Sequence, residues 1–218
     1  MLIIGIDPGP KESGYIEYDT ELNDIYVPGV RPNEEIESVL QLRYAKTTLA
    51  IEMVASYGMA VGESVFRTCV QIGRFEKCCS MPFAEVYRSD VKLTLCGNKR
   101  AKQTNIVHCL TDMFGGKDKA IGGNKCKKCK GKGWSGRNRE VCSQCRGTGW
   151  LNPPGPLAGV KSHAWSALAV ALTYAILNGH LSPLVANPGG LCRSSRPSAR
   201  GCLEDNSRAC STPLDNDS

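Results

Sequence analysis

The chain has 218 residues and a formal net charge of +6, which is enough for one globular domain with an insertion or a tail. Its first apolar run is only six residues long and lacks a basic flank, and the longest later one, residues 164–177, is too short to span a bilayer. These features argue against a secreted or membrane protein. We therefore expect a cytoplasmic protein whose 12 cysteines bind metal rather than form a disulfide framework.

Apolar periodicity and turn residues predict an alternation of strands and helices. The first strand, residues 1–6, is almost wholly apolar, which is typical of a central strand covered on both faces of its sheet. Further strands are expected at residues 13–19, 24–30, 48–52 and 83–87, and helices at residues 33–43, 61–78, 88–95, 99–114 and 162–178. Ser162 is the expected N-cap of the last helix.

Composition divides the chain into four parts. Residues 1–116 form the first part of an α/β core, and residues 153–181 return to this core with its final helix. Between them, residues 117–152 are rich in Gly, Lys and Cys, and they contain too few branched apolar residues to build a core of their own. Residues 182–218 are dominated by Pro, Ser, Arg, Asn and Asp, which predicts a disordered tail.

Two matching cysteine repeats occur in the insertion. Each reads C-x-x-C-x-G-x-G-W, and together they supply four thiols, from Cys126, Cys129, Cys142 and Cys145. A spacing of two residues lets both thiolates of a repeat reach one ion, so we predict a zinc knuckle that holds one structural Zn²⁺. The repeat resembles the cysteine-rich units of DnaJ-type chaperones. Those chaperones carry four units and this chain carries two, so a chaperone function does not follow.

Positive charge is concentrated in one stretch of the chain. Residues 88–146 carry fifteen Lys and Arg against four Asp and Glu, whereas the first sixty residues carry ten acids and four bases. This favours a nucleic-acid surface over a merely solvated face. The knuckle lysines Lys127, Lys128 and Lys130 suit phosphate contacts. Trp134 and Trp150 would either stack on bases or pack together as a small core.

Two carboxylates stand at the ends of apolar strands, Asp7 after the first and Glu52 after the strand at 48–52. Judged on its own strand, Asp7 fits a cap of the turn before Pro8 and a metal ligand equally well. Phosphodiester hydrolysis with two metal ions needs three or four oxygen or imidazole ligands around ions about 4 Å apart. His163, at the start of the last helix, is a third candidate ligand.

Three motifs, in this order, resemble the RuvC-type Holliday-junction resolvases of the RNase H-like superfamily, especially the divergent forms of phage and prophage. They are G-I-D-P-G at 5–9 followed by S-G-Y at 13–15, L-A-I-E at 49–52, and H-A-W-S-A-L-A-V-A at 163–171. The resemblance covers roughly residues 1–114 and 153–180. It implies an α/β fold in which a mixed five-stranded sheet is flanked by helices, with the zinc knuckle inserted.

The resemblance also implies an active site that uses Mg²⁺ or Mn²⁺. Asp7 and Glu52 fall on catalytic acids of the family, and His163 falls on the first of two ligands on the last helix. Ser166 stands where the family has the second, an acid, and a hydroxyl is a poor Mg²⁺ ligand. Three protein ligands would then hold metal, with water at the remaining positions.

The same resemblance implies how DNA is held. The family places basic residues after glycine-rich turns near the active site, and Lys99, Arg100 and Lys102 resemble that segment. Lys92 is a further candidate for DNA contact. An aromatic residue after the family's glutamate can wedge into the junction, and Tyr57 is the aromatic in that region. Such resolvases are usually homodimers, because symmetric cleavage needs two active sites.

We therefore predict a Mg²⁺-dependent, structure-selective endonuclease that cuts branched DNA in a bacterial or phage-infected cell. The alternative is a resolvase-fold module whose active site has lapsed at Ser166, and which binds branched DNA without cutting it. A third hypothesis, an ATPase of the actin and sugar-kinase type, ranks last because that fold normally needs two such domains and 218 residues are too few.

Overall fold

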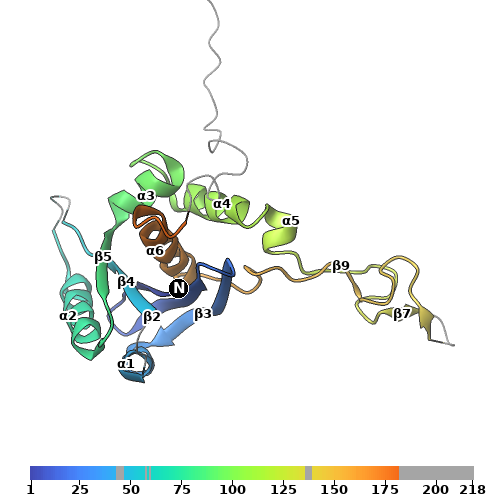
Figure 1. The fold of residues 1–218 in the computed structure, drawn as a ribbon, viewed down its shortest axis with the longest axis horizontal. Helices are drawn as coiled ribbons and strands as arrows, with labels where there is room; N and C mark the ends of the chain where they lie inside the picture. The colour runs from blue at the N-terminus through green and yellow to red at the C-terminus, as the bar shows by residue number, and fades with distance from the viewer. Residues whose placement is uncertain (43–46, 57, 59, 136–138, 182–218) are drawn as a thin grey trace, which may run out of the picture.

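The computed structural model describes residues 1–42, 47–56, 58, 60–135 and 139–181. Two features predicted from sequence, Tyr57 and the tail at 182–218, lie outside these residues. Over the described parts the fold is a five-stranded sheet with helices on both faces, from which a narrow arm extends (Figure 1).

The sheet has the strand order β3-β2-β1-β4-β5. Its strands are β1 Leu2–Asp7, β2 Glu12–Asp19, β3 Asp24–Pro32, β4 Thr47–Met53 and β5 Phe83–Tyr87. The first three strands form an antiparallel meander, and β4 and β5 then run parallel to β1. The strand β1 is therefore central, as its apolar sequence predicts.

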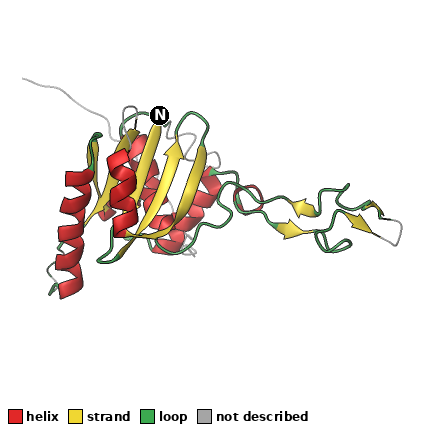
Figure 2. Cartoon of the chain, turned by 90° about the horizontal axis from the view of Figure 1, so that it is seen from below, coloured by secondary structure: helices red, strands yellow, loops and turns green. Residues whose placement is uncertain are grey.

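Six helices lie in the described part of the chain. They are α1 Asn33–Leu42, α2 Glu63–Cys78, α3 Arg88–Cys96, α4 Gln103–Met113, α5 Lys117–Ala120 and α6 Ala164–Leu177. The two-residue period of β1 divides the core between the two faces of the sheet. Ile3 packs in a cluster with α3, α4 and α6, whereas Ile4 and Ile6 pack in a second cluster with α1 and α2. Figure 2 shows the sheet between these helices.

The helix α6 approaches the sheet unusually closely, because two glycines leave room for its backbone. A Cβ on Gly5 of β1 would lie 2.2 Å from the carbonyl oxygen of Ala167, and one on Gly14 of β2 would lie 2.3 Å from that of His163. Real side chains do not tolerate such distances. The glycines therefore fix the height of the first turn of α6 above β1 and β2.

The arm begins after α5 and consists of two small antiparallel ribbons. The first pairs β6 Asn124–Lys125 with β9 Trp150–Asn152, and the second pairs β7 Trp134–Ser135 with β8 Glu140–Val141. Its buried side chains are the four cysteines and no larger apolar cluster is described there. The described residues of the arm thus form no hydrophobic core of their own, and the arm extends away from the body (Figures 1 and 2).

Three helix starts differ from the sequence prediction, and the helix expected from residue 61 begins at Glu63. The helix expected from residue 99 begins at Gln103, because Gly97 adopts a left-handed conformation and the backbone N–H of Ala101 closes a turn onto Asn98. The predicted N-cap Ser162 is wrong: Ser162 has a positive φ of 48°, and His163 is the N-cap of α6. No helix in the described residues is long and apolar enough to cross a membrane.

The close approach of α6 predicts that Gly5→Ala is costly. The new methyl group would overlap the carbonyl oxygen of Ala167, so the free energy of unfolding should fall by about 1–3 kcal/mol or more. Gly29→Ala is the matched control, since a Cβ at Gly29 of β3 meets nothing within 4 Å. Urea unfolding of both variants checks this. Equal stabilities of the two variants would contradict it.

Candidate active site

The predicted acids meet at one edge of the sheet. Because β1 and β4 are parallel neighbours, Asp7 and Glu52 both lie near the carboxyl ends of their strands, where α/β sheets commonly bind ligands. The first turn of α6 adds side chains from the side. Together they open a pocket of about 500 Å³. Its lining residues are Asp7, Glu52, Arg88, Gln103, Ser162, His163 and Ser166.

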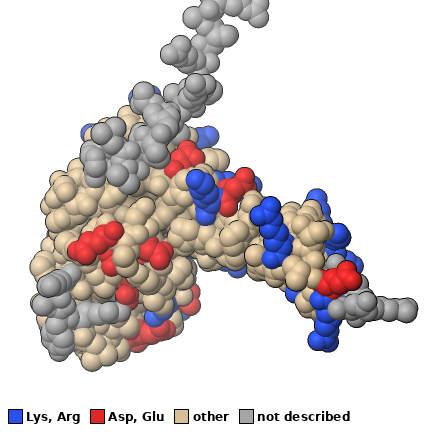
Figure 3. Space-filling model, turned by 45° about the vertical axis from the view of Figure 1, so that its right-hand side comes forward, with Lys and Arg blue, Asp and Glu red and all other residues tan. Residues whose placement is uncertain are grey.

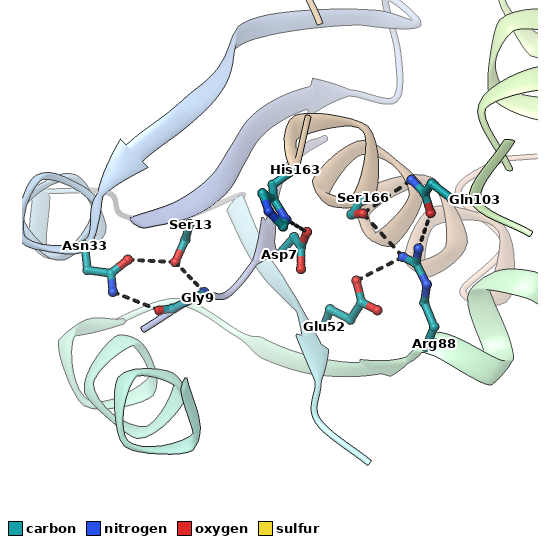
Figure 4. A network of polar contacts seen from close by, with 9 residues as sticks. All are labelled: Asp7, Gly9, Ser13, Asn33, Glu52, Arg88, Gln103, His163 and Ser166. Atoms are coloured by element: carbon teal, nitrogen blue, oxygen red, sulfur yellow. Dashed lines mark hydrogen bonds and ion pairs between the residues drawn. The ribbon is translucent and has the colours of Figure 1, made fainter. Parts of the chain in front are cut away.

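Asp7 and His163 are in direct contact. The Nδ1 atom of His163 lies 2.8 Å from Oδ2 of Asp7 (Figure 4). The carboxylate is largely buried, at 17% exposure, whereas the imidazole is 67% exposed. When Nδ1 carries the proton and donates a hydrogen bond to Asp7, the lone pair of the neutral ring lies on Nε2. The pair thus fixes the orientation of an exposed imidazole.

The surroundings of Glu52 raise the pKa of its carboxyl. Burial raises the pKa of its carboxyl to about 7; the positive charge of Arg88 opposes this shift, and the negative charge of Asp7 adds to it. The Glu52 side chain is 14% exposed, and its Oε2 lies 3.2 Å from Nη1 of Arg88. A carboxylate held in this way gains from any further cation that reaches it.

Arg88 connects three other lining residues. Its Nη1 donates to Glu52 and lies 3.4 Å from Oγ of Ser166, and its Nη2 donates to Oε1 of Gln103. The Nε2 of Gln103 lies 3.5 Å from the same Ser166 oxygen. Figure 4 shows the guanidinium between Glu52 and α6. Neither Arg88 nor Gln103 is among the site residues predicted from the sequence. Arg88 directly follows β5, so the rule that singled out Asp7 and Glu52 could have found it.

The turn after Asp7 is held by a separate polar network. The backbone N–H of Gly9 donates to Oγ of Ser13 at 3.1 Å, and this hydroxyl donates to Oδ1 of Asn33 at 2.7 Å. The Nδ2 of Asn33 then donates to the carbonyl of Gly9 at 3.0 Å. These bonds tie β1, β2 and α1 together (Figure 4). They position the strand end that carries Asp7.

The pocket offers ligand types that a hard divalent ion uses, but the ligand atoms of Asp7, Glu52 and His163 do not all lie within 4.8 Å of one another. Two carboxylates and an open, water-accessible pocket match the usual surroundings of Mg²⁺ or Mn²⁺, which keep several waters, whereas an imidazole is a more common ligand of transition metals such as Zn²⁺. The part around Ser166 suits an ion less well, because it offers a hydroxyl beside a guanidinium. Asp7 and Glu52 are also held by different partners, His163 and Arg88.

The four cysteines form a second candidate metal centre. All are buried, and within the described residues they are the only group of three or more His, Cys, Asp or Glu whose ligand atoms lie within 4.8 Å of one another. The Sγ atoms of Cys126 and Cys142 are 3.8 Å apart, and those of Cys129 and Cys145 are 3.6 Å apart. A tetrahedral zinc site with Zn–S bonds of about 2.3 Å requires sulfurs about 3.8 Å apart.

The glycines of the repeats direct backbone N–H groups at two of the sulfurs. The N–H groups of Gly133 and Gly149 each donate to a sulfur at 3.3 Å, to Cys129 and Cys145 respectively. The backbone N–H of Cys145 lowers the pKa of the Cys142 thiol to about 6, against the opposing effect of burial. The backbone N–H of Cys129 acts in the same direction on Cys126, but burial and the neighbouring thiols of Cys129 and Cys142 outweigh it and raise the pKa of Cys126 to about 11. Such donors favour thiolates, which is the form that binds zinc. The cluster can therefore hold a zinc ion.

The predicted DNA-contacting lysines and arginine fall in two places. Lys99 and Arg100 are exposed in the turn before α4, Lys102 is exposed at its N-cap, and Lys92 is half-buried on α3. Gln103, which follows Lys102, lines the pocket. The second group, Lys127, Lys128 and Lys130, is exposed on the arm. In Figure 3 Lys and Arg gather on the arm, whereas the visible face of the body carries several acids.

The two arm tryptophans lie beside cations. The Lys132 ammonium and the Arg139 guanidinium each lie 5.2 Å from the ring centre of Trp134, and the Lys125 ammonium lies 6.0 Å from that of Trp150. Trp134 remains 37% exposed. The arm thus presents flat aromatic surface together with positive charge.

No protein-family model and no curated protein matches the sequence. Solved structures do match the fold, and two of them are RuvC proteins. Thermus thermophilus RuvC has a TM-score of 0.53 and 17% identity, over 80% of this chain and 93% of that one. T. thermophilus RuvC in complex with a Holliday junction substrate has a TM-score of 0.50 and 17% identity, over 82% of this chain and 94% of that one. The predicted fold class, a RuvC-like mixed sheet flanked by helices, is confirmed.

The raised pKa of Glu52 predicts a pH-dependent stability gain for Glu52→Gln. Below pH 4.5, the ordinary pKa of the carboxyl in the unfolded chain, Glu52 is protonated in both states and does not lower the free energy of unfolding. As the pH rises toward 7, the unfolded chain releases the proton before the folded chain does, and the free energy of unfolding falls. The stability difference between variant and wild type should therefore rise by up to about 3 kcal/mol between acidic pH and a pH of about 8. Urea unfolding without added divalent ions measures it, with the exposed Glu85→Gln as control. A difference that stays flat with pH would exclude this cost.

The cysteine geometry predicts about one zinc ion per chain in the purified protein, by elemental analysis. Cys142→Ser should lose it, because a hydroxyl does not replace a thiolate ligand. Cys69→Ser, which alters an exposed cysteine on α2, should keep the ion. Hydrogen exchange should then show loss of protection in the arm but not in the sheet. Zinc retained at full stoichiometry by Cys142→Ser would refute the site.

Proposed function

We propose that this protein is a metal-dependent, structure-selective DNA endonuclease that resolves Holliday junctions or other branched DNA by phosphodiester hydrolysis. One observation carries the proposal: Asp7, Glu52 and His163, from three distant parts of the sequence, line one pocket at the carboxyl ends of β1 and β4. The fold around that pocket is the one of a protein whose solved complex contains a Holliday junction substrate.

In the proposed site, Asp7 and Glu52 hold the divalent ion, either Mg²⁺ or Mn²⁺. When bound, such an ion would activate water and offset negative charge on the phosphate. Glu52 is suited to this role, since a cation relieves the cost of keeping its buried carboxyl ionised. His163 completes the site: Asp7 holds Nδ1, so that Nε2 is available to the ion or to the proton of the attacking water.

The proposed DNA surface combines the pocket rim and the arm. Lys92, Lys99, Arg100 and Lys102 would hold the phosphates next to the cut, and the exposed lysines of the arm would hold a duplex farther out. The arm itself would be kept in shape by one structural Zn²⁺ at the four cysteines. Symmetric cleavage of a four-way junction needs two pockets, so we propose that the protein acts as a homodimer.

The endonuclease proposal predicts that Asp7→Asn abolishes Mg²⁺-dependent cleavage of a four-way junction but leaves junction binding intact. The amide of Asn has nearly the same size as the carboxylate and can still form a hydrogen bond, but it lacks the negative charge that binds the ion. Gel shift and cleavage assays on one preparation measure both properties. Asp112→Asn, which alters an exposed acid of α4, is the matched control and should cut normally.

Two results would contradict this prediction. Full cleavage by Asp7→Asn would remove Asp7 from the metal site. If the unmutated protein cuts no branched, duplex or RNA–DNA hybrid substrate with Mg²⁺ or Mn²⁺, the enzyme hypothesis fails. A junction complex that forms and weakens steeply with salt would then support the alternative module, which binds branched DNA without cutting it.

A further inference from the structure

The pocket carries less negative charge than a site for two divalent ions requires. Its Asp, Glu and Arg side chains are Asp7, Glu52 and Arg88, so that one of the two carboxylates is already paired with a positive charge. Ser166 contributes a hydroxyl at the position where the sequence resemblance places an acid. A second ion beside Ser166 would find one shared carboxylate and a nearby positive charge.

Arg88 stands where that second ion would be needed. Its Nη1 lies 3.2 Å from Oε2 of Glu52 and 3.4 Å from Oγ of Ser166, so the guanidinium bridges the strand-end acid and the first turn of α6. In a site for two ions, the side chains at these two positions would help to hold the second ion. We propose that the guanidinium of Arg88 replaces the second metal ion, so that this pocket works with a single divalent ion; this inference rests on the proposed nuclease function.

The guanidinium has the properties that this role needs. It stays charged at any working pH, and its planar set of five N–H donors can hold protein acceptors and phosphate oxygens together. The contacts with Glu52, Ser166 and Gln103 fix its plane before substrate arrives. Gln103 is therefore a positioning residue, while Arg88 would touch the reacting phosphate. A fixed cation in a partly buried site stabilises developing charge strongly.

The proposed step balances without a second ion. The oxygen of water forms a bond to phosphorus, and the proton of that water passes to Nε2 of His163. The bond between phosphorus and the 3′ oxygen breaks, and its electron pair stays on that oxygen. Arg88 donates a hydrogen bond to the leaving oxygen, which then takes a proton from solvent. The products are a 5′ phosphate and a 3′ hydroxyl.

A purely structural role is the competing explanation for Arg88. In that case the guanidinium would only neutralise Glu52, and the pocket would still take two ions or would take none. The number of bound ions separates these possibilities, because it can be counted without any cleavage. Mn²⁺ is a suitable probe, since its binding to the zinc-loaded, DNA-free protein is visible by electron paramagnetic resonance.

If Arg88 replaces the second ion, the wild-type protein should bind one Mn²⁺ per pocket, and the Asp7→Asn variant should bind none there. Ser166→Asp alone should still bind one, because Arg88 lies next to the new carboxylate and would pair with it. The double variant Ser166→Asp with Arg88→Ala should bind two. Two ions in the wild type, both lost in Asp7→Asn, would overturn the inference, as would a double variant that still binds one.

Cleavage supplies an independent readout. Arg88→Ala should lower the single-turnover rate by about 10³-fold, the scale of other arginines that stabilise a phosphoryl transition state. Guanidinium ion at tens of millimolar should restore part of the rate, and urea should not. Arg67→Ala is the matched control, because Arg67 also pairs with a glutamate, Glu63, but on the exposed face of α2. It should cut like the wild type.

The failures of the inference and of the nuclease proposal differ. A wild-type protein that cuts junctions with two ions bound, or an Arg88→Ala variant that cuts at the full rate, overturns the role of Arg88 and leaves the nuclease standing. A wild-type protein that cuts no DNA substrate overturns the nuclease itself, and the role of Arg88 falls with it.

Discussion

The close contact between α6 and the first two strands is the constraint on which the pocket depends. Gly5 and Gly14 allow the backbone of the first helical turn to rest directly on β1 and β2. At that height His163 reaches Asp7 and Ser166 reaches Arg88, although these pairs are 156 and 78 residues apart in the sequence. A sheet and a helix separated by ordinary side chains would hold the same residues too far apart. Because Gly5 and Gly14 lack a Cβ, residues from three distant sequence motifs can line one pocket.

Charge balance in that pocket links burial to chemistry. Burial makes the ionised form of Glu52 expensive, and Arg88 offsets only part of this cost. The folded chain therefore keeps a carboxyl that is poised to accept a cation, at the expense of stability. The pairing of Asp7 with His163 is different, because its imidazole is exposed and can exchange protons with solvent. The two acids have distinct partners and need not do the same work.

The sequence predicted the sheet and the pocket acids because their signals are local. An apolar run that ends in Asp7 or Glu52 identifies a buried strand and places its acid at the strand end, and parallel pairing brings the ends together. The repeated spacing located the cysteine cluster in the same way. Arg88 also directly follows a strand, β5, and this position can be read from the sequence, but its contact with Ser166 depends on how α6 lies across the pocket, which no local pattern contains. The start of α6 was also misplaced, since the left-handed backbone of Ser162 gives no signal in the sequence.

The two candidate metal centres differ in burial and in ligand type, so they do not compete for the same metal ion. The four thiols are buried and close enough to fill all positions of a tetrahedral ion, which leaves none for a substrate. The acids lie in an open pocket with room for water and phosphate. Soft thiolates prefer zinc, whereas carboxylates suit Mg²⁺ or Mn²⁺, so the donor types alone would sort the ions. The chain can therefore use one ion in place of the hydrophobic core that its arm lacks, and a different ion for chemistry in the body.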